Sequence, residues 1–521
     1  MKLTMKKGPF YSILATFALG GNSLTIQAVQ KKETHQSPRP NILWVMAEDM
    51  GHDLSCYGMP NVKTPVLDKM ASEGIQYVHA FCSNPISSPS RSGMMTGIHQ
   101  TIIDAHNHRS NRDKPLPQDV KPFTYYLRKV GYTCILGNEQ VFSKGRKIDC
   151  NFKTEPIGPY DGVTHFGLFD KYDHFTKADQ PFFAQIQLKV THRGDWWKSI
   201  TQASKHPVDP KTVEMPPYLA DAPKVREQWA SYLDQVEHMD MEMGLLLAQL
   251  KKEHLLDNTI IFFIGDNGRC DIRGKGYLWN AGLEVPMIAW GKNIPHLLDT
   301  QMRSTLDITA TILQLAHAEM PANLTGHPLF DNQGNIDSGD SYEYGARDDW
   351  DEAIDCIRSI ATNRFKYIRN YMPQVGWDQH QQYLEFHRPD VHVMRTLKQE
   401  GKLNSAQLQF FADHKPYEEL YDLMSDPYEL HNLAEDPTYR DTLLVMRKHM
   451  EQWQAIHRDC GLEDRTTRHP SPATGIVQWV QEKHPDQWKA LQRGEICEHY
   501  KDWMMEMKSA KKKASKSEKK Q

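Results

Sequence analysis

Two continuous apolar runs constrain the fold of this 521-residue chain more than any other feature. Residues 40–47 and 259–264 lack the alternation of a half-exposed strand, so both fit strands buried on both faces of a parallel sheet. Other segments also show strand or helix patterns: strands at 132–136, 181–188 and 285–290, and helices at 66–74, 122–131 and 227–255. Strands that alternate with helices predict a doubly wound α/β sheet with helices on both faces.

The pattern changes after about residue 326. Residues 357–360 and 365–369 fit antiparallel strands, and 439–457 fits a helix. A chain of this length exceeds one usual domain. We therefore expect a large domain over residues 38–325 and a smaller C-terminal α+β domain with an antiparallel sheet over 326–505.

The two ends of the chain differ from the rest in composition. Three lysines within the first seven residues precede a short apolar run, which is typical of an export signal, here residues 1–28. The run is too short to span a membrane securely, so we expect export to the periplasm or outside without stable membrane insertion. A signal anchor is the alternative. Residues 506–521 are dominated by Lys, Ser and Ala and predict a disordered tail, or a contact with a polyanionic glycan or surface.

The overall composition excludes several classes of protein. A net charge of −4 and a hydrophobic content of 39% suggest neither a nucleic-acid binder nor a disordered chain. Eight cysteines occur without a Cys-x-x-Cys pair, which argues against a zinc module. In an exported protein they leave room for one or two disulfides.

Polar side chains follow both of the long apolar runs. Glu48 and Asp49 come after the first, and Asp266 and Asn267 come after the second. Because parallel strands end at one edge of a sheet, these four side chains can meet there. Carboxylate and amide oxygens suit a hard cation such as calcium or magnesium. Each pair by itself would more often be a loop cap.

A serine-rich segment lies between these pairs in sequence. Ser87 begins the pattern Ser-x-Pro-Ser-Arg, which ends at Arg91, and Thr96 and Gly97 follow it. A serine where a loop enters a helix faces the end that favours anions, and Arg91 adds a fixed cation. The segment by itself also fits a turn that caps a helix.

This pattern resembles the motif of the type I sulfatases, and the resemblance extends over residues 40–434. In that family the first residue of the motif, here Ser87, is oxidised to formylglycine, and the fold resembles that of alkaline phosphatase. The resemblance implies a calcium ion bound by Glu48, Asp49, Asp266 and Asn267 beside residue 87, although the family usually has Asp where this chain has Glu48. It implies a hydrated aldehyde that attacks sulfur, with Asp266 as proton acceptor and Arg91 neutralising charge.

Other positively charged or titratable residues match the family less specifically. Lys275 resembles the lysine or arginine that contacts sulfate after the Asp-Asn pair, and His192 resembles the histidine of the mid-domain strand, with a role in sulfate contact or proton transfer. His106, His108 and Arg109 follow the serine motif and are candidates for substrate contact, or else belong to a surface loop.

One segment departs from the family pattern. The family usually carries Gly-Lys-x-His after the strand that matches residues 132–136, but this chain has Gly137, Asn138, Glu139 and Gln140. Lys147, together with Asp149, is a candidate replacement, and Lys144 is another. The identity of the acid that protonates the leaving group is therefore open.

The resemblance also implies a substrate and a partner. Segments around residues 239–250, 266–282 and 452–453, with His192 and Arg193, are most similar to the heparan N-sulfatases (sulfamidases). We therefore expect an exported bacterial enzyme that acts on a sulfated glycan of the glycosaminoglycan type. A Ser-type motif implies an anaerobic sulfatase-maturating enzyme as partner. The alternatives are an O-sulfatase for galactose or N-acetylgalactosamine of mucin or algal glycans, a phosphatase of the same superfamily, and an inactive sulfoglycan-binding relative.

Overall fold

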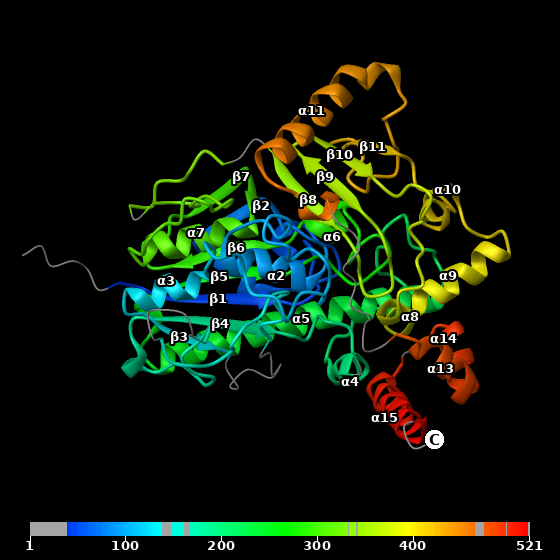
Figure 1. Cartoon of the computed structure of the whole chain (residues 1–521), viewed down its shortest axis with the longest axis horizontal. Helices are drawn as coiled ribbons and strands as arrows, with labels where there is room; N and C mark the ends of the chain where they lie inside the picture. The colour runs from blue at the N-terminus through cyan, green and yellow to red at the C-terminus, as the bar shows by residue number, and fades with distance from the viewer. Residues whose placement is uncertain are drawn as a thin grey trace, which may run out of the picture. The chain divides into compact units, whose positions relative to one another are not determined.

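A seven-stranded mixed sheet forms the centre of the computed structural model, with the strand order β3-β4-β1-β5-β6-β2-β7 (Figure 1). The structure describes residues 39–137, 147–160, 167–194, 196–331, 333–339, 342–463, 474–495 and 497–518. β1 lies between β4 and β5 and is parallel to both. The strands are β1 Asn41–Ala47, β2 Ile75–Phe81, β3 Thr133–Leu136, β4 Phe182–Leu188, β5 Thr259–Gly265, β6 Met287–Gly291 and β7 Leu297–Ser304.

Helices cover both faces of this sheet, as the alternating pattern predicts. Leu43 and Val45 point to the face packed by α1 (Pro65–Glu73) and α5 (Pro223–Lys252). Ile42 and Trp44 point to the other face, where α2, α3 and α7 pack. Because both faces are covered, all seven β1 residues are buried, which explains the unbroken apolar run. These last helices are α2 Ser87–Thr96, α3 Phe123–Lys129 and α7 Thr305–Leu315.

The C-terminal part contains the expected antiparallel sheet, with the order β11-β10-β9-β8. Helix α11 (Arg440–Ile456) packs Leu443, Met446 and Met450 against it. The four strands are β8 Glu343–Arg347, β9 Ile357–Ala361, β10 Phe365–Asn370 and β11 Glu418–Asp422. The fold class predicted from the sequence is therefore confirmed.

The second sheet also holds the loop that leads into α2. The backbone N–H of Ala346 on β8 donates to the carbonyl of Ser83 at 3.1 Å. The side chain of Asn84 donates to the carbonyl of Ala346 at 2.6 Å. These bonds fix the residues just before Ser87, so the small sheet helps to position the first turn of α2.

The chain ends in helices that pack on one another. Trp503 and Met507 of α15 (Tyr500–Glu518) are buried against Ile476 and Val480 of α13. Residues 506–518, expected from the sequence to be disordered, thus belong to a helix, since Lys, Ala, Met and Glu are strong helix formers and one face finds an apolar partner. The remaining helices are α4 Trp196–Ala203, α6 Asn280–Leu283, α8 Gln382–His387, α9 Pro389–Gln399, α10 Ser405–Leu408, α12 Cys460–Glu463, α13 Ile476–Lys483 and α14 Pro485–Gln492.

Several expectations about the chain as a whole can be compared with this structure. All eight cysteines are free thiols, so none of them forms a disulfide. Within the described ranges, every helix is too short or too polar to span a bilayer. The predicted export signal at residues 1–28 and the candidate Lys144 lie outside the described residues.

Candidate active site

The polar residues that follow β1 and β5 lie side by side at the carboxyl edge of the sheet. Ala47 pairs with Gly265, so the residues that follow the two strands are neighbours. The backbone N–H of Asp49 donates to Asp266 Oδ1 at 2.9 Å, and Asn267 Nδ2 donates to Asp49 Oδ1 at 3.1 Å. Asp49 has a φ of 52°, a left-handed conformation that Asp tolerates better than most residues. Hydrogen bonds thus join the two strand ends into one cluster.

Ser87 joins this cluster from the first turn of α2. Its side chain is buried, and Oγ donates to Asn267 Oδ1 at 2.8 Å. Ser90 Oγ donates to the carbonyl of Asp266 at 2.7 Å, which holds the same turn against the end of β5. The N-terminal end of a helix favours negative charge, so residue 87 lies where an anion is stabilised.

Arg91 provides the positive charge that balances Asp266. Its Nε and Nη2 donate to Asp266 Oδ2 at 3.1 and 2.5 Å. Nη1 donates to Gln187 Oε1 at 3.0 Å, and Nη2 lies 3.8 Å from Glu48 Oε1. Burial would lower the pKa of Arg91, but Asp266 and Glu48 outweigh it and raise the pKa, so the side chain stays charged.

Two lysines and one histidine surround the other carboxylates. Lys147 Nζ donates to Glu48 Oε2 at 2.8 Å, and Lys275 Nζ donates to Asp49 Oδ1 at 2.6 Å. Burial alone would raise the pKa of Glu48, but Lys147, Arg91 and His192 lower it to about 2. Burial and the two lysines lower the pKa of His192 to about 3, so its ring is neutral at neutral pH.

The chemistry of these donors fits a hard cation. Glu48 Oε1 and Asp49 Oδ2 are buried oxygens without a hydrogen-bond partner among the described residues. Such atoms are costly to bury unless a donor or a cation satisfies them. With Asp266 and Asn267 they form a set of oxygen donors of the kind that calcium binds. In the described part of the chain, no three His, Cys, Asp or Glu side chains are grouped as a metal site by themselves.

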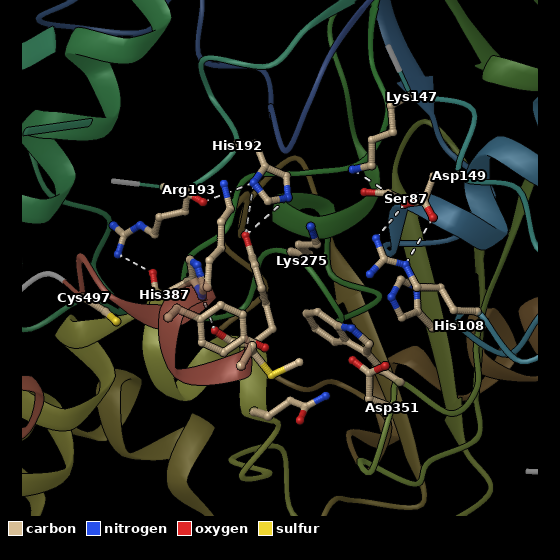
Figure 2. Close-up of a pocket in the computed structure, with 18 of the residues that line it drawn as sticks. Ser87, His108, Lys147, Asp149, His192, Arg193, Lys275, Asp351, His387 and Cys497 are labelled. Atoms are coloured by element: carbon tan, nitrogen blue, oxygen red, sulfur yellow. Dashed lines mark hydrogen bonds and ion pairs between the residues drawn. The ribbon is translucent and has the colours of Figure 1, made fainter. Parts of the chain in front are cut away.

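The cluster opens into a cavity of about 620 Å³. Figure 2 shows Ser87, Lys147, His192 and Lys275 around it, together with His108. Arg109 also lines the cavity and pairs with Asp149 at 2.9 Å. Most of the residues singled out in the sequence are thus brought together in one place.

His106 is the exception among the predicted site residues. It does not line the cavity, and its ring is buried with Nδ1 3.9 Å from Asp104 Oδ1. His108 does reach the cavity, where its Nδ1 lies 3.1 Å from Ser88 Oγ. The two histidines therefore have different surroundings although only one residue separates them.

Tyr383 lines the cavity although no sequence motif marks it. It lies on α8, and its hydroxyl lies 3.4 Å from His192 Nε2. Lys275 Nζ lies 5.0 Å from the centre of its ring, close enough for a cation–π contact. His387 stacks on the same ring at 4.3 Å. The C-terminal part of the chain thus supplies one wall of the site. No local sequence motif predicts this contribution.

Comparison with known proteins assigns the chain to a family. Residues 40–318 match the model of the Sulfatase family. The chain belongs to the sulfatase family. The resemblance seen in the Ser87 motif is thereby confirmed, and this protein is a sulfatase with the alkaline-phosphatase-like fold.

Individual sulfatases match over most of the chain. An ulvan-active sulfatase of Formosa agariphila is 32% identical over 493 residues, which cover 85% of this chain and 79% of the relative. Human N-sulphoglucosamine sulphohydrolase is 23% identical over 479 residues, covering 80% and 89%. The solved structure of BT1596, a 2-O GAG sulfatase, superposes with a TM-score of 0.57 at 17% identity and covers 82% of this chain and 94% of that one.

The buried pair of Arg91 and Asp266 gives a prediction about stability. Arg91→Ala leaves the Asp266 carboxylate buried without its main partner, so the free energy of unfolding should fall by about 3–5 kcal/mol. Urea unfolding followed by circular dichroism measures this. The matched control is Arg458→Ala, which breaks the exposed pair with Glu463 and should leave the free energy of unfolding nearly unchanged. Equal losses in the two variants would contradict the assigned role of the buried pair.

Proposed function

We propose that this sulfatase hydrolyses sulfated glycans with residue 87, matured to formylglycine, as the nucleophile and with one bound calcium ion. The observation that carries the proposal is the hydrogen bond from Ser87 to Asn267, which places the residue to be modified on the cluster of acids at the strand ends. The motif at residues 87–91 supports formylglycine, and the unpartnered oxygens of Glu48 and Asp49 support calcium.

Formylglycine and calcium would each supply chemistry that the unmodified chain lacks. When present, formylglycine provides a hydrated aldehyde as nucleophile, and calcium lowers the pKa of a bound hydroxyl and neutralises sulfate charge. Glu48, Asp49, Asp266 and Asn267 would hold the ion. Overall, water cleaves the S–O or S–N bond, and the products are sulfate and a free hydroxyl or amine.

The remaining roles fall to residues that already contact the cluster. We assign Asp266 as proton acceptor, with Arg91 holding its carboxylate in place. Lys275 and His192 line the cavity beside the cluster, where the sulfate oxygens would lie. The charge of Lys275 favours the charge of the transition state, and the neutral His192 ring can contact sulfate through a ring N–H. Lys147 lies within the same cavity and takes the place of the missing Gly-Lys-x-His lysine. Lys147 and His192 are our two candidates for protonating the leaving group, His192 only where the bound anionic sulfate raises its pKa enough to charge the ring.

The substrate class rests on the relatives. The matched relatives are named for ulvan and for N-sulphoglucosamine, and related folds were solved with a neocarrahexaose and with D-glucosamine-2-N,6-O-disulfate. These names agree on sulfated saccharides, and we infer the same class here. We also infer export, since the N-terminal pattern fits a signal, and maturation by an anaerobic sulfatase-maturating enzyme, since position 87 is serine.

A prediction tests the nucleophile. In protein produced together with a Ser-type maturase, the tryptic peptide containing residue 87 should be lighter by about 2 Da, because oxidation of an alcohol to an aldehyde removes two hydrogens. Ser87→Ala should abolish sulfate release. The matched control is Ser92→Ala, on the same helix but hydrogen-bonded to the Ser88 carbonyl, which should keep activity. Sulfate release by the unmodified protein at the same rate would refute this nucleophile.

A second prediction concerns calcium. Adding calcium to the stripped protein should raise the melting temperature by a few degrees, because the ion binds only the folded site, and one calcium per chain should be found by elemental analysis. Asp49→Asn together with Asn267→Ala should remove this stabilisation. Asp486→Asn, an exposed change on α14, should retain it. Stoichiometric zinc without calcium would favour the phosphatase alternative.

A third prediction separates N-sulfate from O-sulfate. The nitrogen of a sulfamate is more basic than the bridging oxygen of a sulfate ester and is protonated more easily before the bond breaks. A site without the usual histidine at position 140 should therefore depend less on a protein acid when it cleaves a sulfamate. We expect sulfate release from N-sulfoglucosamine to exceed that from glucosamine 6-O-sulfate. Release confined to O-sulfated galactose or N-acetylgalactosamine would replace the aminosugar assignment with the O-sulfatase alternative and leave the sulfatase chemistry intact.

A further inference from the structure

The last helix of the chain forms part of the wall of the active-site cavity. Tyr500, Lys501, Met504 and Lys508 of α15 line the same cavity as Ser87. In Figure 2, Ser87 and Asp149 lie at one side of the view, and His387 and Cys497, which precedes α15, lie at the other. The cavity thus extends from the reacting residue to a helix beyond the region matched by the family model, which ends at residue 318.

Packing fixes which face of α15 looks into the cavity. Lys501, Met504 and Lys508 have the spacing i, i+3 and i+7, so they share one face of the helix. Trp503 and Met507 lie on another face and are buried among apolar residues of α8, α13 and α14. Tyr500 packs on Phe386 at 5.1 Å and on His387 at 4.9 Å, which joins α15 to the helix that carries Tyr383. The helix is therefore held in place as a wall.

The two lysines on this face differ from every other cation of the cavity. Among the described residues, neither Lys501 nor Lys508 has an ion pair or a hydrogen-bonded side-chain partner. All the other lysines and arginines of the lining are paired with a carboxylate: Arg109 and Arg112 with Asp149, Lys147 with Glu48, Arg193 with Asp390, and Lys275 with Asp49.

Among the described residues, none of the acids that line the cavity forms an ion pair with either lysine. Glu498 pairs with Lys198 at 2.9 Å, and Asp502 lies 3.7 Å from His499. Asp149 forms ion pairs with Arg109 and Arg112. Asp351 accepts a hydrogen bond from Gln381 at 2.8 Å. Two lysine ammonium groups without a paired carboxylate among the described residues, about 10 Å apart along the helix axis, therefore line this cavity, together with the carboxylates of Asp351 and Asp502.

We propose that α15 forms a binding subsite for a second anionic group of the glycan, which Lys501 and Lys508 contact while the sulfate to be cleaved lies at Ser87. This proposal rests on the proposed glycan-sulfatase function and narrows it to polyanionic substrates. The anionic group is a uronate carboxylate or a further sulfate, since both present oxygen atoms to a lysine ammonium. Met504, between the two lysines on this face, offers an apolar surface to the sugar ring.

The test uses the full-length matured protein and the double variant K501Q/K508Q. The control K483Q/K489Q makes the same change in net charge on α13 and α14, outside the cavity. Three substrates carry the sugar that the wild type desulfates: a monosulfated monosaccharide, a disaccharide with one sulfate and a uronate, and a disaccharide with two sulfates and no carboxylate. Thermal unfolding confirms that the variants are folded.

We expect K501Q/K508Q to raise KM about tenfold for at least one disaccharide, as two partly exposed charge contacts together would. Its kcat, and its KM for the monosaccharide, should match the wild type. The disaccharide that is affected identifies the group as carboxylate or sulfate. Added salt should raise the wild-type KM for that disaccharide and change the KM of the variant much less.

Other outcomes would overturn the proposal. If K501Q/K508Q leaves the KM of both disaccharides unchanged, the two lysines are only solvated. The same conclusion follows if K501Q/K508Q raises the KM of the monosaccharide equally, or if the control K483Q/K489Q raises the KM of the disaccharides equally. Binding of the disaccharides to Ser87→Ala, with and without K501Q/K508Q, measures the subsite without turnover. If the wild type releases no sulfate from any sugar, the proposed function fails, whereas the binding experiment still decides on the subsite.

Discussion

The parallel pairing of β1 with β5 is the constraint on which the rest of the site depends. It brings two segments more than 200 residues apart in sequence to one edge of the sheet, with Ala47 opposite Gly265. Each segment ends in groups that cannot be buried alone, because an unpaired carboxylate in a protein interior is strongly unfavourable. The surrounding structure therefore has to supply donors and cations at this point.

Charge compensation organises the elements around that edge. Helix α2 brings Arg91 to Asp266. Lys147, which follows β3 in the chain, pairs with Glu48, and Lys275, in the segment after β5, pairs with Asp49. In a buried site such interactions are stronger than at the surface, and their geometry is fixed before a substrate arrives. The same arrangement that stabilises three buried acids also provides an environment in which an anion can react.

The C-terminal part of the chain determines what else can enter the cavity. β8 fastens the loop before Ser87, α8 places Tyr383 against His192, and α15 closes the far wall. A fold shared among sulfatases provides the reacting cluster, whereas specificity depends on the walls that each chain adds. The walls supplied by the C-terminal part are therefore where differences in substrate between relatives are expected.

The sequence by itself determined the strands buried on both faces, the long helix α5, the antiparallel sheet and the family, because apolar periodicity and a specific motif are local signals. It also singled out candidate residues that the structure brings together at the ends of β1 and β5. It did not show β2 and β7, whose polar residues such as Gln76 and Asp299 interrupt the apolar pattern. It also did not distinguish His106 from His108, or show that Tyr383 faces His192. Only the tertiary structure decided these features, because they depend on contacts between segments far apart in the chain. For the same reason only the structure showed that the lysine-rich end belongs to helix α15.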